Sequence, residues 1–208
     1  MSNIWFTSDT HFCHDKDFIY TPRGVSTVDE MNEAIVERWN KVVQPNDTVY
    51  HLGDIALKDT TAAIKFINAL NGNIIWFLGN HDSPNRVREV LENCPNVKLH
   101  RDRYVTTMEF TVFDQKLKIY LSHYRTDTSN FDDKHFSRHV FNFHGHTHQT
   151  NNWRDPLNPY VYHVGLDSHN MTPVHIEEAI TDIKQRVKEL EKLPASLTTN
   201  LFVTPYAE

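Results

Sequence analysis

Several short segments of the chain place metal-binding side chains directly after an apolar stretch, and the central one begins at Gly79. It follows the apolar residues 73–78, which have the length and composition of a buried strand. Gly79 allows a sharp backbone turn, after which Asn80, His81 and Asp82 offer an amide oxygen, an imidazole and a carboxylate. The Asp82 carboxylate is suited to hold the His81 imidazole in one tautomer. Taken alone, the segment is equally consistent with a polar turn after a strand.

Four other segments repeat this pattern of an apolar strand followed by ligand-type residues. They place Asp9 and His11 after residues 4–8, Asp54 after 48–52, His123 after 117–122, and His146 and His148 after 140–143. In open α/β sheets, functional residues collect just beyond the carboxyl ends of the strands, where the loops converge. Together the segments predict a divided metal site whose ligands come from separate strand ends.

Predicted helices and strands alternate between these motifs. Apolar residues at helical spacing predict helices over residues 27–43, 60–70, 84–93 and 176–193. Thr27 and Glu30 form a capping box for the first, and Pro84 suits the first position of the third. Further strands are expected at 97–99, 104–113, 117–121 and 160–164, with a hairpin turn at Asp114 and Gln115. Residues 9–23 are expected to form a polar loop, and residues 132–139 a short helix or a loop bordering the site.

Length and composition favour one soluble domain over residues 1–208, with residues 194–208 as a tail able to dock on its surface. The net charge of −6 and the lack of a long basic run disfavour sequence-independent binding to nucleic acid, but leave a local basic rim open. The chain has two cysteines and no CxxC pair, so reduced thiols in a cytoplasm are favoured over disulfides. The N-terminal residues are typical of a first strand and lack the features of a signal peptide, which also favours a cytoplasmic location. No stretch approaches the roughly 18 apolar residues that are needed to cross a membrane.

The order of these motifs resembles that of the calcineurin-like metallophosphoesterases, above all the small stand-alone members from bacteria and phages. The matching residues are Asp9-x-His11, Gly53-Asp54, Gly79-Asn80-His81-Asp82, His123 and Gly145-His146-x-His148. The resemblance extends from the first strand to about residue 167, and so covers most of the chain. It implies an α/β fold, a four-layer α/β/β/α sandwich of two mixed β-sheets flanked by helices.

The resemblance also implies two divalent metal ions and a role for each ligand. Asp9, His11 and His148 would hold the first ion, Asn80, His123 and His146 the second, and Asp54 would bridge the two. His81 and Asp82 would be the catalytic residues, with His81 facing the substrate. Nitrogen and oxygen donors without thiolate suit Mn²⁺, our first expectation, and also Fe, Ni²⁺, Zn²⁺ or Co²⁺.

The expected reaction is hydrolysis of a phosphoester by attack of a metal-activated hydroxide. Two ions roughly 3.5–4 Å apart neutralise the phosphoryl oxygens and lower the pKa of a bridging water, while His81 protonates the departing oxygen. Candidate substrate-binding residues are Arg125, Tyr124 and His14. Because only Arg125 directly flanks a motif position with positive charge, phosphodiesters are favoured over monoesters.

Other substrates and functions stay open at this point. Arg23 and Arg154 are interpreted either as solvated side chains or as distant partners for the second charge of a monoester. The expected partner is a small phosphoester or a nucleotide. Nucleic acid stays open as a partner, although the charge does not indicate it, and the oligomeric state is not predicted. The alternatives are a phosphomonoesterase or nucleotidase, a protein phosphatase, or a non-catalytic interaction scaffold of the same fold.

Overall fold

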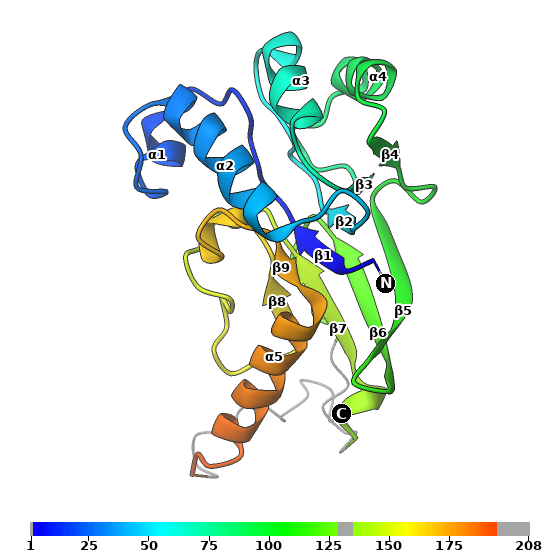
Figure 1. Cartoon of the computed structure of the whole chain (residues 1–208). Coiled ribbons are helices and arrows are strands. Elements are labelled where there is room, and N and C mark those ends of the chain that lie inside the picture. The colour runs from blue at the N-terminus through cyan, green and yellow to red at the C-terminus, as the bar shows by residue number, and fades with distance from the viewer. Residues whose placement is uncertain (1, 129–134, 195–208) are drawn as a thin grey trace, which may run out of the picture.

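Two mixed β-sheets packed face to face form the centre of the computed structural model, which describes residues 2–128 and 135–194 (Figure 1). The first sheet has the order β4 (Val97–Leu99), β3 (Asn73–Trp76), β2 (Thr48–His51), β1 (Ile4–Thr7) and β9 (Val174–His175). The second has the order β5 (Val105–Val112), β6 (Gln115–Ser122), β7 (Val140–His144) and β8 (Val161–His163). The pairs β1–β9 and β5–β6 are antiparallel and the other pairs are parallel.

Helices flank both sheets, and side-chain caps fix where most of them begin. The helices are α1 (Asp17–Tyr20), α2 (Val28–Val42), α3 (Thr60–Asn68), α4 (Pro84–Asn93) and α5 (Ile176–Leu190), with short 3-10 helices at Phe136–Arg138 and Leu166–Ser168. The side chains of Thr27, Asp59 and Ser83 each accept a hydrogen bond from a backbone N–H in the first turn of the helix that follows. The helices α2, α3 and α4 lie beside the first sheet, with which they share a hydrophobic cluster.

Two hydrophobic clusters hold the layers together. In the first, apolar residues of α2, such as Ile35 and Trp39, pack with Ile74 and Trp76 of β3. In the second, residues between the sheets pack with Ile180 and its neighbours on α5. Along each strand, successive side chains point to opposite faces, so one strand contributes to both clusters. The strand ends that carry the motifs are therefore buried on both faces.

These observations confirm the predicted α/β fold with two mixed sheets and flanking helices. The hairpin turn lies one residue earlier than expected, at Phe113 and Asp114, whose φ angles of 49° and 59° match the left-handed conformation of a type I′ turn. The segment expected to be a polar loop, residues 9–23, contains the four-residue helix α1, which was not predicted. Strand β9 was also missed, because two residues are too short to show a period.

Some of the expected features fall outside the described residues. Of the segment 132–139, residues 136–138 form a 3-10 helix, and residues 132–134 are not described. Of the tail expected at residues 194–208, residues 195–208 also lie outside the described part of the chain, so its docking is not tested. Among the described residues, no helix combines the length and the apolar character that crossing a membrane requires.

Candidate metal centre

The carboxyl ends of β1, β2, β3, β6 and β7 converge and bring the sequence motifs together. Because β1, β2 and β3 are parallel neighbours, the loops that follow them leave the first sheet at one edge. Several residues of these loops have left-handed backbone conformations: Asp9 (φ 59°), His11 (49°), Asp54 (57°), His146 (67°) and His148 (46°). Such conformations are uncommon for residues other than glycine, and they cluster at functional sites. The surrounding fold thus imposes an unfavourable backbone conformation at the positions where the motifs meet.

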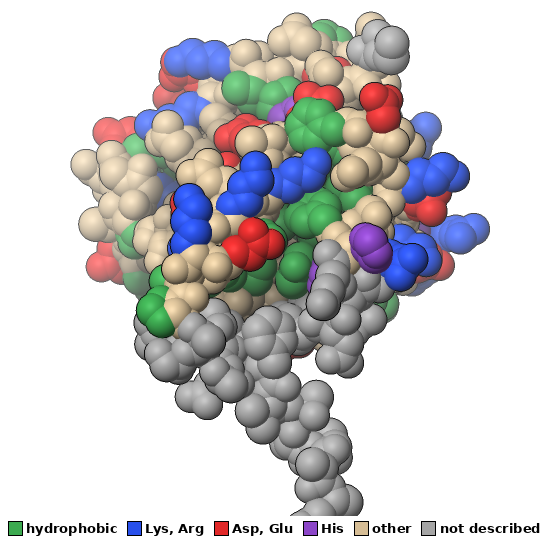
Figure 2. Space-filling model, turned by 90° about the horizontal axis from the view of Figure 1, so that it is seen from below, with side chains coloured by type: hydrophobic (Ala, Val, Ile, Leu, Met, Phe, Trp, Pro, Cys, Tyr) green, Lys and Arg blue, Asp and Glu red, His purple; other side chains and the backbone are tan. Residues whose placement is uncertain are grey.

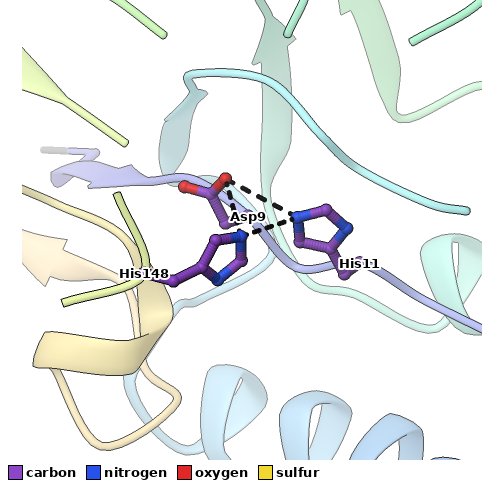
Figure 3. A group of neighbouring side chains, drawn as sticks. All are labelled: Asp9, His11 and His148. Atoms are coloured by element: carbon purple, nitrogen blue, oxygen red, sulfur yellow. Dashed lines mark hydrogen bonds and ion pairs between the residues drawn. The ribbon is translucent and has the colours of Figure 1, made fainter. Parts of the chain in front are cut away.

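Asp9, His11 and His148 form a first group of converging ligand atoms (Figure 3). The Nε2 atoms of His11 and His148 are 3.1 Å apart. They lie 3.7 Å and 3.8 Å, respectively, from Oδ1 of Asp9. Asp9 Oδ1 is buried and has no hydrogen-bond partner in the described part of the chain. Two imidazole nitrogens facing each other beside an unpaired carboxylate oxygen are the arrangement that a bound cation would stabilise.

Asp9, Asp54 and His123 form a second group, which lies against the first. His123 Nδ1 lies 2.8 Å from the carbonyl oxygen of Leu52. A hydrogen bond donated there leaves the Nε2 lone pair for the group, 3.4 Å from Asp54 Oδ2 and 2.9 Å from Asn80 Oδ1. The same Asp54 Oδ2 lies 3.7 Å from Nε2 of His11. One carboxylate oxygen therefore faces a histidine of each group.

The electrostatics of the two groups keep both acidic side chains ionised. Burial would raise the pKa of Asp9, but His11, His123 and His148 hold it well below its usual range. Burial would also raise the pKa of Asp54, but the pKa is lowered overall, chiefly by His123. Burial lowers the pKa of His123, but the two carboxylates raise it to about 9. The pair of buried carboxylates thus supplies the negative charge that a cation site needs.

The remaining predicted site residues line the exposed side of these groups. His146 donates its backbone N–H to Asp9 Oδ2 at 2.9 Å. Its imidazole lies beside the imidazole of His123 and the phenol ring of Tyr124, with ring centroids 5.0 Å and 4.7 Å away. Tyr124 is exposed, and so is Arg125, which follows it. The structure thus brings the His146 ring next to the second group without placing it among the converging ligand atoms.

His81 and His14 lie beside the first group. The ring of His81 is 5.6 Å from that of His11 and is exposed. Its backbone is fixed on both sides, because the N–H donates to Asp54 Oδ1 at 2.8 Å and the carbonyl accepts from Arg86. His14 is buried, with its ring 5.1 Å from that of His11, and burial together with the neighbouring histidines lowers its pKa to about 4. A neutral His14 is thus available as an uncharged neighbour of the site.

The interpretation of Asp82 as the partner of the His81 imidazole is wrong. Its Oδ2 accepts the backbone N–H groups of Asp54 and Gly79 at 2.7 Å and 2.8 Å, and its Oδ1 accepts that of Ile55 at 3.2 Å. Burial raises the pKa of Asp82 to about 6, against the opposing effect of these amides. Asp82 therefore joins the loop after β2 to the loop after β3 and holds the backbone of Asp54 in place.

Comparison with known proteins agrees with this arrangement. Residues 3–186 match the model of the calcineurin-like phosphoesterase superfamily domain. The chain belongs to this superfamily. Membership implies metal-dependent hydrolysis of phosphoesters, and Asp9, His11, Asp54, His123 and His148 of this calcineurin-like chain are the candidate metal-binding residues.

Two relatives and one solved structure illustrate how far the similarity extends. An uncharacterized protein of Methanocaldococcus jannaschii is 40% identical over 94 residues, which are 44% of this chain and 53% of that protein. The match thus spans about half the length of that relative. The Gene 66 protein of Mycobacterium phage D29 is 28% identical over 89% of this chain and 99% of its own length. A protein of unknown function from Aquifex aeolicus has a similar fold, with a TM-score of 0.59 at 20% identity, and the match covers 91% of this chain and 100% of the other.

Two residues, Arg23 and Asp167, hold the first ligand group in place, and the sequence did not predict this supporting role. Asp167 Oδ2 lies 3.0 Å from Nδ1 of His148, and Asp167 Oδ1 accepts from Nε of Arg23 at 2.9 Å. The buried guanidinium of Arg23 also donates to the carbonyl oxygens of Asp9 and Thr10, at 2.7 Å and 3.1 Å. The solvated and phosphate-binding interpretations of Arg23 are therefore both wrong. The position of Asp167, just beyond β8 at the end of another strand, was the signal that was available.

Asp167→Asn is expected to weaken metal binding at the first group. The Asp167 carboxylate fixes the orientation of His148, and Arg23 together with His148 holds its pKa well below the usual range against the effect of burial. Loss of such a supporting carboxylate typically lowers metal affinity roughly 10- to 100-fold. Calorimetric titration of the metal-free protein with Mn²⁺ measures the change. The control is Asp182→Asn, which removes the carboxylate bound to the Tyr162 hydroxyl and should leave the affinity unaltered.

Proposed function

We propose that this chain is a dinuclear metal-dependent phosphoesterase that prefers phosphodiesters. The observation that carries the proposal is the position of Asp54, whose Oδ2 faces His11 of one ligand group and His123 of the other. In this proposal, Asp54 bridges two divalent ions. Asp9, His11 and His148 complete the first site, and Asn80, His123 and His146 complete the second. Elemental analysis of the protein purified with Mn²⁺ tests this reading, and two ions per chain are expected.

The chemistry divides between the ions and the side chains around them. When bound, the two ions would neutralise the phosphoryl oxygens and activate a water for attack. The exposed His81 imidazole, whose backbone is tied to Asp54, is placed to give a proton to the departing oxygen. Asp82 takes part as a positioning residue, because its bonds to the amides of Asp54 and Gly79 keep the bridging carboxylate in register. Nitrogen and oxygen donors without thiolate favour Mn²⁺, with Fe, Ni²⁺, Zn²⁺ and Co²⁺ as alternatives.

The preference for diesters follows from how the nearby arginines are used. Arg23 is buried in its ion pair with Asp167, and Arg86 is buried with its guanidinium on the carbonyl of His81. Both guanidinium groups are therefore already bound within the protein. The second negative charge of a monoester would then be neutralised by solvent or by Arg125. A diester carries one negative charge and has no such requirement.

A direct comparison of two nitrophenyl substrates tests the preference. With Mn²⁺ bound, we expect kcat/KM to be about tenfold higher for bis(4-nitrophenyl) phosphate than for 4-nitrophenyl phosphate, a difference of about 1.4 kcal/mol. Arg125→Ala is measured in parallel, because Arg125 is exposed and follows His123 by two residues. A monoester preference that disappears in Arg125→Ala would show that Arg125 meets the second charge, and the diester proposal would then be wrong.

The charge of the protein favours a small substrate over a long nucleic acid. The net charge is −6, and on the face shown in Figure 2 the Lys and Arg side chains are interspersed with Asp and Glu. A sequence-independent nucleic-acid surface requires clustered positive charge along the backbone path. We therefore propose a small phosphoester or a nucleotide as the substrate.

A further inference from the structure

Two exposed aromatic side chains, Phe18 and Tyr124, contact histidines at the two ligand groups: Phe18 packs on His14, next to His11 of the first group, and Tyr124 packs on His123 of the second. Phe18 is 66% exposed and belongs to α1, whereas Tyr124 is 53% exposed and follows β6. A single exposed apolar side chain is common on protein surfaces and needs no explanation. Two aromatic rings beside one candidate active site, contributed by segments far apart in sequence, are a more specific arrangement.

Phe18 is connected to the first ligand group through one imidazole. Its ring packs edge-on against that of His14, with centroids 5.8 Å apart and an interplanar angle of 87°. The His14 ring is in turn 5.1 Å from that of His11. Because His14 is buried, it fixes one edge of the Phe18 ring, and much of the remaining ring surface faces solvent.

Tyr124 has the corresponding relation to the second ligand group. Its ring centroid is 4.7 Å from that of His146 and 5.2 Å from that of His123, both at steep interplanar angles. The Tyr124 carbonyl accepts from the hydroxyls of Ser122 and Thr126, at 2.7 Å and 3.3 Å, which holds the backbone in place. The ring is thus positioned next to the site and still leaves about half of its surface exposed.

We propose that Phe18 and Tyr124 each stack on one nucleobase, and that the substrate is a dinucleotide whose scissile phosphate lies at the metal centre between them. The proposal rests on the phosphoesterase function proposed above and names the substrate class of that site. Every nucleobase has an aromatic face, and stacking on a protein aromatic ring contributes about 1–3 kcal/mol per base. Hydrolysis adds water across one P–O bond, which yields a nucleoside monophosphate and a nucleoside whose new hydroxyl takes the proton.

A short substrate agrees with the charges of the protein better than a long strand does. The stacking surfaces contribute affinity without positive charge, whereas a long strand would need many Lys or Arg contacts along its backbone. The net charge of −6 disfavours such contacts. Two bases around one phosphate use both rings, and need no further contact with a nucleic-acid backbone.

The test compares a substrate with two bases and a substrate with none. For the Mn²⁺-loaded wild type and for Phe18→Ala and Tyr124→Ala, kcat/KM is measured for dithymidine dinucleotide and for methyl 4-nitrophenyl phosphate. We expect the ratio of the two values to fall about 5- to 150-fold in each variant, which is the loss of one stacking contact.

Phe18→Tyr and Tyr124→Phe keep an aromatic ring and should restore the wild-type ratio. Phe113→Ala is the control, because Phe113 is 49% exposed but lies at the hairpin turn, near Lys184 of α5.

Binding gives a second readout that does not depend on turnover. We expect thymidine 5′-monophosphate to bind the wild type more tightly than methyl phosphate does, with this difference in Kd reduced in at least one of the two alanine variants. An unchanged substrate ratio in both variants, or an equal loss for both substrates, overturns the stacking proposal and leaves the phosphoesterase proposal intact. If the metal-loaded wild type hydrolyses neither substrate, the proposed function fails, and the stacking proposal with it.

Discussion

Asp54→Ala is expected to lose bound metal and activity together. Asp54 Oδ2 faces a histidine of each ligand group, so its removal takes a negative ligand from both proposed metal positions at once. Its Oδ1 also accepts the backbone N–H of His81, and the loop after β3 loses that anchor. Because a bound ion supplies several kcal/mol of transition-state stabilisation, kcat/KM should fall about 10³-fold or more.

Metal content and folding have to be measured on the same Asp54→Ala sample. Elemental analysis should give fewer than two ions per chain, while circular dichroism should still show the helices and sheets, because the side chain packs in neither hydrophobic cluster. Asp59→Ala is the matched control, since it removes a carboxylate from the same loop after β2, where it caps α3, and should retain both ions. A folded Asp54→Ala protein with two ions per chain would contradict the bridging assignment.

The sequence was sufficient to predict the convergence of the ligands because strand order leaves few alternatives. Neighbouring parallel strands end at one edge of a sheet, so residues that follow them, such as Asp9 and Asp54, must lie close together. His148 comes from the other sheet, yet its Nε2 lies 3.1 Å from that of His11. A motif read at a strand end thus carries information about tertiary structure, which a motif in an isolated loop does not.

The supporting contacts could not be predicted in the same way. Arg23 and Asp167 are 144 positions apart, and neither belongs to one of the five metallophosphoesterase motifs. Asp82 was assigned to its sequence neighbour His81, but the turn at Gly79 directs the carboxylate to backbone amides of the loop after β2. Such choices depend on which donors the folded loops present, and adjacency in sequence does not determine that.

His81→Ala is expected to retain both metal ions and to lose catalytic rate. The His81 imidazole is exposed and belongs to neither ligand group, so its removal takes away no proposed ligand. General acid catalysis by a positioned side chain contributes roughly 10²–10⁴-fold, and a loss of this size is expected for substrates with an alkoxide leaving group. Nitrophenolate departs readily without a proton, so the loss should be much smaller for nitrophenyl esters.

A series of diesters with leaving groups of increasing basicity decides whether His81 donates a proton. In the wild type the rate should depend weakly on the basicity of the leaving group, and in His81→Ala the dependence should become steep, because the developing negative charge is no longer neutralised. His175→Ala is the control, since His175 ends β9, caps α5 and packs on Trp5 at the opposite end of β1. The rates of this variant should match those of the wild type. An equal loss across the series, with both ions retained, would mean that His81 stabilises charge on the phosphoryl group without transferring a proton.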